Sequence, residues 1–318
     1  MNSKMDRRKF IRHSSLLGIV GTGLAACNVT DELFQTNEKC APNILSFAER
    51  RHWLSSFSCN IEQWFRPIPF LDRINAAKAL GFSAIEIWNP HQVKQGKSPN
   101  AIAQRAIDLN MRITSYSPGA PNFADPNNEK VFKRWLDVAI EAGKALNVSN
   151  FNLTGHKKID GLTTQEMIKN YTRMLKWAAP RLESENMVAT VEPYNPWNHK
   201  GHFIYGKEPA LSICRKVNSK SIKLNWDFFH MQRTNGNLIT NLEEGFDQVE
   251  YIQLADAPGR NQPGSGEVAY GHILTRLREL GYQGFIGAEY FPKDKNALKA
   301  ASDLAYLAKS VSLHPPRF

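Results

Sequence analysis

The chain has 318 residues, of which 42% are hydrophobic, and this is ample for a packed core. It is therefore not a disordered polypeptide. Its formal net charge is +10, but the basic residues are scattered and form no stripe interleaved with aromatic residues. Nucleic acid is accordingly not an expected partner. The sequence leaves the oligomeric state open, homo-oligomers included.

The first 26 residues have the features of an export signal. The pair Arg7-Arg8 precedes the apolar run "SLLGIVGTGLAA", which is too short to span a bilayer comfortably. The segment resembles a bacterial twin-arginine (Tat) signal, and "LAAC", ending at Cys27, resembles a lipobox. An amphipathic helix with a chance arginine pair is the alternative. We predict a signal peptide over residues 1–26 and an exported, periplasmic-side lipoprotein tethered to the membrane through Cys27.

The segment after the signal shows no sustained hydrophobic periodicity. Residues 27–48 are therefore predicted to form a tether between the lipid and a folded domain over residues 49–318. Beyond Cys27 the chain holds Cys40, Cys59 and Cys214, an odd number at no metal-like spacing. This pattern argues against a disulfide framework and against a zinc knuckle.

From residue 49 onward, short apolar runs alternate with amphipathic stretches. The runs expected to be buried strands are "HWLSSFSCN", "FSAIEIW", "RITSYS", "VSNFNLT", "MVATVEPY", "IKLNWDFF", "VEYIQLAD" and "GFIGAEYF". In "ALGF" and "ELGY" a glycine follows the last helical turn, where a left-handed residue is favoured. Eight such units predict an α/β fold, a single (β/α)₈ TIM barrel. A doubly wound sheet is less favoured because no strand is followed by G-x-G-x-x-G.

Four acidic or amide residues occupy equivalent places at the strand ends. Alternate residues of a barrel strand face the lumen, and catalytic groups come from the carboxyl ends. This alternation places Asp227 at the inward end of the sixth strand. The same alternation places Glu192, Gln253 and Glu289 at the inward ends of the fifth, seventh and eighth strands. Such an oxygen set favours Mg²⁺ or Mn²⁺, whereas isolated ion pairs inside the barrel are the alternative.

Three longer motifs carry a family resemblance. "DFFHMQRTNGNL" from Asp227, "IQLADAPGRNQPGSGEVAY" from Ile252 and "GAEYFP" from Gly287 resemble the hydroxypyruvate isomerases, within the xylose-isomerase-like TIM barrels. The resemblance implies a divalent metal held by residues of the last four strands, and two of these residues would also form the proton-transfer pair. The implied ligands are Glu192, Asp227, Gln253 and Glu289, and the implied pair is Glu192 and Glu289. Ketose 3-epimerases usually carry histidine where this chain has Gln253.

Further residues are expected around this centre. The resemblance makes His230 and Arg260 substrate contacts. Trp88 would be a wall for the apolar face of a sugar, and His156, which closes the fourth strand segment, is a further substrate-binding candidate. The residues expected to support the site or to order its loops are Glu86, Asp256 and Glu267.

The resemblance implies an isomerase that moves a proton next to a carbonyl through an enediolate. The expected substrate is a small hydroxy-carbonyl compound, either of the hydroxypyruvate or tartronate semialdehyde type or a free sugar, and export favours the sugar. The alternatives are a ketose 3-epimerase, a 3-keto-glycoside lyase or hydratase, and a non-catalytic sugar-binding lipoprotein. A phosphodiester-cleaving DNA-repair enzyme is less favoured because such enzymes hold a zinc cluster with many histidines.

Overall fold

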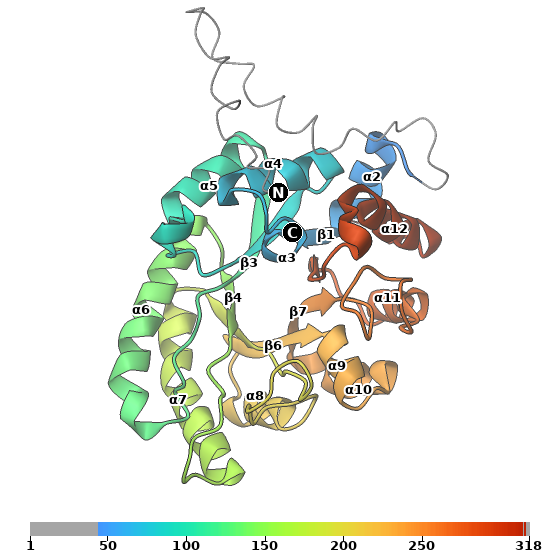
Figure 1. Cartoon of the computed structure of the whole chain (residues 1–318). Coiled ribbons are helices and arrows are strands. Elements are labelled where there is room, and N and C mark those ends of the chain that lie inside the picture. Colours follow the sequence, from blue (N-terminus) through green and yellow to red (C-terminus); the bar gives the residue numbers. More distant parts are fainter. Residues whose placement is uncertain (1–43, 314, 316–318) are drawn as a thin grey trace, which may run out of the picture. The chain divides into compact units, whose positions relative to one another are not determined.

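The computed structural model describes residues 44–313 and 315, and these form a closed parallel barrel with strand order β1-β2-β3-β4-β5-β6-β7-β8. The prediction of a single (β/α)₈ barrel is confirmed (Figure 1). The predicted signal peptide, Cys27 and the tether up to residue 43 lie outside the described residues. Within residues 44–313, no helix combines the length and the apolar character that crossing a membrane requires.

Every strand pairs in parallel with its neighbours, and β1 pairs with β8 to close the barrel. The strands are short, with three residues in β8 and six in β3. Their bounds are β1 Phe57–Asn60, β2 Ala84–Trp88, β3 Arg112–Ser117, β4 Asn150–Leu153, β5 Val188–Val191, β6 Ile222–Asp227, β7 Val249–Leu254 and β8 Ile286–Ala288.

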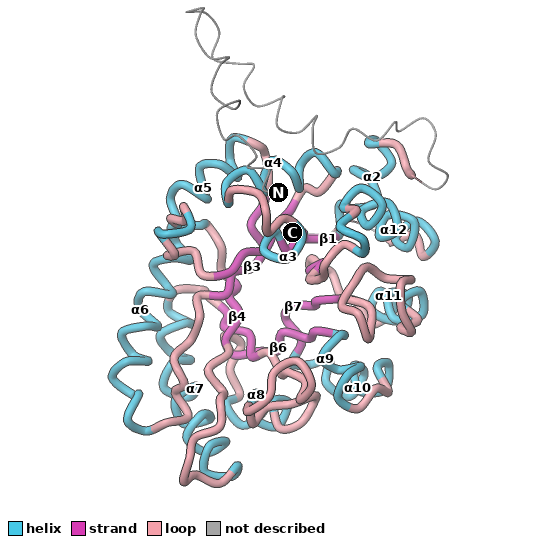
Figure 2. Tube along the Cα trace, viewed as in Figure 1, coloured by secondary structure: helices cyan, strands magenta, loops and turns pink. Residues whose placement is uncertain are grey.

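The helices surround the strands as an outer ring (Figure 2). Their bounds are α2 Phe47–Trp53, α3 Ile61–Trp64, α4 Phe70–Leu80, α5 Pro99–Asp108, α6 Glu129–Leu146, α7 Thr164–Ser184, α8 Ala210–Val217, α9 Phe228–Thr234, α10 Leu238–Gly245, α11 Tyr270–Glu279 and α12 Ala297–Ser310. Local signals fix their ends: a capping box of Thr163 and Glu166 starts α7, and Gly81, with φ 105°, ends α4.

Strand β6 shows how the barrel separates apolar from polar side chains. Trp226 is fully buried on the outer face, where its ring lies against Gly245 of α10. Asn225, one residue earlier, points the other way and donates from Nδ2 to Gln253 Oε1 in the lumen. The alternation predicted for this strand is therefore the one observed, and it delivers Asp227 to the lumen end.

The first strand unit differs from the expected run "HWLSSFSCN". Its first residues, His52 and Trp53, end helix α2, and β1 begins only at Phe57. Helix α2 starts at Phe47, inside the segment predicted as tether, because Ser46 and Glu49 form a capping box there. Leu45 is already buried, so the folded domain begins a few residues before the predicted boundary.

Helix α6 packs closely against the barrel at Gly143. A Cβ there would lie 2.1 Å from Met187 Cε, 2.7 Å from the Tyr116 hydroxyl and 2.9 Å from a backbone oxygen. We expect Gly143→Ala to lower the free energy of unfolding by about 1–3 kcal/mol in urea denaturation, despite the better helix propensity of alanine. Gly271→Ala in α11 is the matched control, because nothing lies within 4 Å of its added Cβ. Equal effects of the two substitutions would contradict this packing.

Candidate active site at the carboxyl ends of the strands

The four residues predicted as metal ligands lie at the same end of the barrel. Glu192 directly follows β5, and Asp227 is the last residue of β6. Gln253 is the penultimate residue of β7, and Glu289 directly follows β8. The sheet register pairs Asp227 with Gln253 and Gln253 with Gly287. All four side chains are buried, so their polar groups must find partners within the site.

The guanidinium of Arg260 lies among these carboxylates. Its Nη2 is 3.2 Å from Asp227 Oδ2 and 2.7 Å from Glu289 Oε2, so one nitrogen contacts the acids of two strands. The guanidinium also lies 4.9 Å from the centre of the Phe229 ring. Arg260 is thus at the centre of the predicted site, where it offsets part of the negative charge.

His230 is carried over the lumen by the short helix that follows β6. Asp227 starts this helix, because its Oδ1 accepts a hydrogen bond of 2.8 Å from the Phe229 backbone N–H. His230 Nε2 then lies 3.4 Å from Glu192 Oε1 and 3.5 Å from Asp227 Oδ2. The Nε2 atom has no hydrogen-bond partner among the described residues. Burial lowers the pKa of His230 to about 3, so the imidazole is neutral.

The charge balance of this centre suits a divalent cation. Burial raises the pKa of Glu192. Burial also raises the pKa of Glu289 well above its ordinary value; Arg260 opposes this shift and the neighbouring acids add to it. Three buried carboxylates thus have one guanidinium to neutralise them. The negative charge that remains is costly in a low-dielectric site. Oxygen-rich, negatively charged sites are those that Mg²⁺ and Mn²⁺ prefer, so the charge and the donor atoms of Glu192, Asp227 and Glu289 suit such an ion.

Donor atoms of Glu192, Asp227 and His230 lie within 4.8 Å of one another, which makes these residues a possible metal site. Gln253, the remaining predicted ligand, is engaged deeper in the lumen. Its Oε1 accepts a hydrogen bond of 2.6 Å from Asn225, and its Nε2 donates to Glu86 Oε1 at 3.0 Å. This oxygen accepts one hydrogen bond and keeps its second lone pair, so Gln253 stays a predicted metal ligand.

Glu86 lies inside the barrel, as the strand alternation predicted. Asn60, the last residue of β1, donates from Nδ2 to Glu86 Oε1 at 2.8 Å and to Glu289 Oε1 at 3.1 Å. Burial raises the pKa of Glu86 to about 7. Its Oε2 has no partner among the described residues and faces Gly287, where a Cβ would lie 2.5 Å away. Gly287 therefore leaves room in the narrow lumen for Glu86.

His156 differs from the substrate contact expected of it, because both of its ring nitrogens already have partners. Nε2 donates to the backbone carbonyl of Glu192 at 3.0 Å, and Nδ1 lies 3.1 Å from Nδ1 of His202. The ring is fully buried, and burial lowers its pKa to about 3. His156 and His202 thus lie behind the strand end and support the backbone at Glu192.

Trp88 ends β2 at the rim of the barrel and is half-buried. Its backbone N–H donates to Glu62 Oε1 at 3.1 Å, and its carbonyl accepts from Lys97 Nζ at 3.0 Å. Lys97 Nζ also forms an ion pair of 2.7 Å with Glu62. This buried pair holds the backbone of the residue that was predicted to form a wall of the substrate site.

The loop that carries Arg260 is held from its inner side by Asp256. The Asp256 carboxylate accepts hydrogen bonds from four backbone N–H groups of this loop, those of Ala257, Gly264, Gly266 and Val268. Glu267 is exposed, and its Oε1 accepts a hydrogen bond of 3.1 Å from Gln232 of α9. Asp256 therefore orders the loop, and Glu267 links it to the helix that carries His230.

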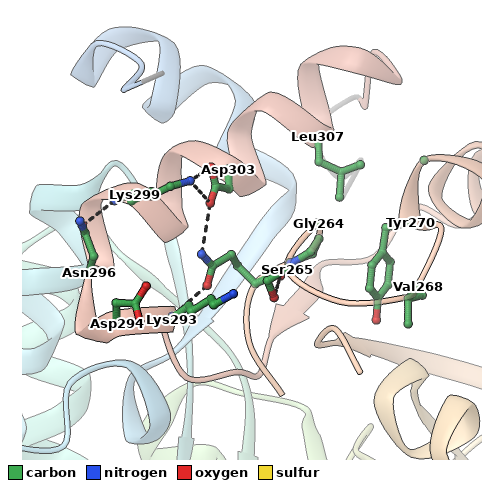
Figure 3. A pocket seen from close by; sticks show the side chains of 13 residues that line it. Gly264, Ser265, Val268, Tyr270, Lys293, Asp294, Asn296, Lys299, Asp303 and Leu307 are labelled. Carbon is green, nitrogen blue, oxygen red and sulfur yellow. Dashed lines mark hydrogen bonds and ion pairs between the residues drawn. The ribbon is translucent and has the colours of Figure 1, made fainter. Parts of the chain in front are cut away.

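The same loop is fixed on its outer side by Gln262, beside a surface groove of about 590 Å³. Gln262 Oε1 accepts from the backbone N–H of Lys293 after β8, and its Nε2 donates to Asp303 of α12 at 3.1 Å. Lys299 pairs with Asp303 in turn (Figure 3). These bonds connect the loop of Arg260 to the loop after β8 and to α12. They therefore help to position Arg260.

Three asparagines of the site were not predicted from the sequence. Asn60 contacts Glu289, Asn152 of β4 donates to Glu192 Oε2, and Asn195 contacts His230. The strand alternation could have found Asn60, which ends the first strand. Asn152 lies within the fourth strand run and could have been counted in the same way. Asn195 lies in a loop, and no periodic signal identifies it.

Comparison with known proteins places the chain in a family. The model of the family described as Xylose isomerase-like TIM barrel matches residues 74–310. Hydroxypyruvate isomerase of Escherichia coli (strain K12) is 27% identical over 241 residues, which cover 74% of this chain and 93% of that protein. A putative hydroxypyruvate isomerase of Danio rerio is 31% identical over 253 residues, with 74% and 90% covered.

Among solved structures, the AP endonuclease, family 2, of Brucella melitensis superposes with a TM-score of 0.72. The two chains are 26% identical, and the match covers 80% of this chain and 98% of the other. The sequence relatives are named as isomerases, which confirms the prediction that this chain is an isomerase. With a family model that covers most of the barrel, the chain belongs to the Xylose isomerase-like TIM barrel family.

Proposed function

We propose that the protein is a metal-dependent isomerase of a small hydroxy-carbonyl compound, of the hydroxypyruvate type or a free sugar, with Glu192 and Glu289 as the proton-transfer groups. The observation that supports this most is the convergence of two buried glutamates from β5 and β8 on one end of the lumen. Binding alone needs no pair of basic carboxylates on different sides of a ligand. The relationship to hydroxypyruvate isomerases agrees with this chemistry.

The two glutamates are oriented for proton transfer by amides behind them. Asn152 donates to Glu192 Oε2, which leaves Oε1 on the side of His230. Asn60 donates to Glu289 Oε1, which leaves Oε2 on the side of Arg260. Burial raises the pKa of both carboxyl groups, and a higher pKa makes a carboxylate a stronger base.

In the proposed reaction, one glutamate takes the proton from the hydroxyl-bearing carbon next to the substrate carbonyl, and a glutamate returns a proton to the former carbonyl carbon. The proton of the neighbouring hydroxyl passes to the former carbonyl oxygen, which completes the isomerisation. Arg260 and His230 bind substrate oxygens. The side chains of Glu192, Asp227, His230 and Glu289 are buried, and this keeps water away from the enediolate. Glu192, Asp227 and Glu289, with Gln253 as the further predicted ligand, would hold a divalent ion. Such an ion would supply a Lewis acid for the negative charge that develops on the substrate.

Deuterium exchange tests the proton transfer. With Mn²⁺ in D₂O, we expect the protein to introduce deuterium next to the carbonyl in at least one member of a panel of hydroxypyruvate, ketoses and 3-keto-glycosides. Glu289→Gln should lower this rate by about 10²–10⁴-fold, because the amide cannot accept the proton. Glu141→Gln, an exposed residue of α6, should leave the rate unchanged. Absence of exchange with every compound would support the sugar-binding alternative instead.

Thermal unfolding tests the metal site. We expect Mn²⁺ to raise the Tm of the protein, because a ligand at 100 times its Kd stabilises the folded state by about 2.7 kcal/mol. Asp227→Asn should abolish this rise, since the amide keeps the helix cap but loses the charge. Asp303→Asn removes a carboxylate of α12 that is bonded to Gln262 and Lys299, and it should keep the rise. An undiminished rise in Asp227→Asn would exclude this site.

We also propose that the protein is exported through the Tat route and anchored by lipid on Cys27. In a Tat-competent bacterium, the protein should incorporate labelled fatty acid and sediment with membranes. Cys27→Ser should abolish both, and replacing Arg7 and Arg8 by lysine should leave the precursor in the cytoplasm. Cys40→Ser is the control, and it should behave as the unaltered chain. Recovery of unprocessed, unlabelled protein from the cytoplasm of the parent strain would contradict the proposal.

A further inference from the structure

Asn195, in the loop after β5, has an amide orientation that its neighbours fix. Its Oδ1 accepts hydrogen bonds from the backbone N–H groups of Trp197, at 3.0 Å, and Asn198, at 2.9 Å. Backbone N–H groups only donate, so the atom facing them must be the oxygen. The side chain is fully buried, and its other atom, the Nδ2 amide nitrogen, therefore points in the opposite direction.

Nδ2 of Asn195 lies 2.7 Å from Nδ1 of His230. An amide nitrogen is a donor only, so Nδ1 must be the acceptor and carries no proton. The single proton of the imidazole is then on Nε2. This nitrogen is fully buried, faces Glu192 Oε1 and Asp227 Oδ2 at 3.4 Å and 3.5 Å, and has no hydrogen-bond partner among the described residues.

We propose that Asn195 is a positioning residue that holds His230 in the Nε2-protonated tautomer, so that His230 donates a hydrogen bond to a substrate oxygen and does not bind the metal. This inference rests on the proposed function, because it assigns a role in that same site. A nitrogen that carries a proton has no lone pair for a metal ion, so the carboxylates of Glu192 and Asp227 remain as the ligands of this cluster.

The tautomer can be measured without substrate, so this test does not depend on the proposed activity. In the folded protein labelled with ¹⁵N-histidine, long-range ¹H–¹⁵N correlation should show His230 with an unprotonated Nδ1 and a protonated Nε2. Adding Mg²⁺ should leave Nε2 protonated. A His230 protonated on Nδ1, or one that loses the Nε2 proton when Mg²⁺ is added, would overturn the proposal.

Asn195→Asp tests the role of Asn195 directly. A carboxylate can still accept from the two backbone N–H groups, but it faces His230 with an acceptor, so Nδ1 should become protonated. We expect kcat to fall by about 10²-fold with KM little changed, because one donor to the developing oxyanion is lost. The matched control is Asn198→Asp, which adds the same charge in the same turn on an exposed side chain. It should leave the tautomer and kcat unchanged.

A double-mutant cycle separates positioning from a merely structural role. If Asn195 acts through His230, Asn195→Asp should lower kcat little further in a His230→Gln background. Additive losses in the two substitutions, or an unchanged His230 tautomer in Asn195→Asp, would overturn the proposal. The measurement on the unaltered protein stands by itself should Asn195→Asp fail to fold.

Discussion

The site depends on the contact of the Arg260 guanidinium with Asp227 and Glu289, because it lets a barrel bury three carboxylates at one end of its lumen. Burying charge is costly unless the charges are paired and hydrogen-bonded. One guanidinium offsets only part of this negative charge. The remainder is the physical reason to expect a divalent cation here. Burial is the main cause of the raised pKa that suits Glu289 as a base, and the neighbouring acids add to it.

The surrounding structure serves to hold these few groups in place. Asp256 fixes the loop that carries Arg260 through four backbone N–H groups, and Gln262 fixes the same loop from outside. Asn60 and Asn152 each hold one oxygen of a glutamate. Such buried amides make the geometry rigid before a ligand arrives, which lowers the reorganisation needed for proton transfer.

The architecture and the inward ends of the last strands followed from hydrophobic alternation in the sequence. Side chains of a strand alternate with period two, so Asp227 had to face the lumen once Trp226 faced the helices. The contacts that residues make beyond a strand end cannot be predicted from this alternation. Asn60 and Glu289, which share a hydrogen bond, are separated by 229 positions in the sequence. The partners of Gln253 and His156 depend on comparable long-range contacts, so their orientations required the structure.

Anomalous diffraction from crystals grown with Mn²⁺ tests the central claim most directly. The account predicts one strong manganese peak bound by Glu192, Asp227 and Glu289, with Arg260 moved away from Asp227 and His230 outside bonding distance of the metal. A peak held by Nε2 of His230 would contradict the assignment of the ligands. No peak at the carboxyl ends of β5, β6 and β8, in crystals soaked at saturating Mn²⁺, would contradict the metal site itself.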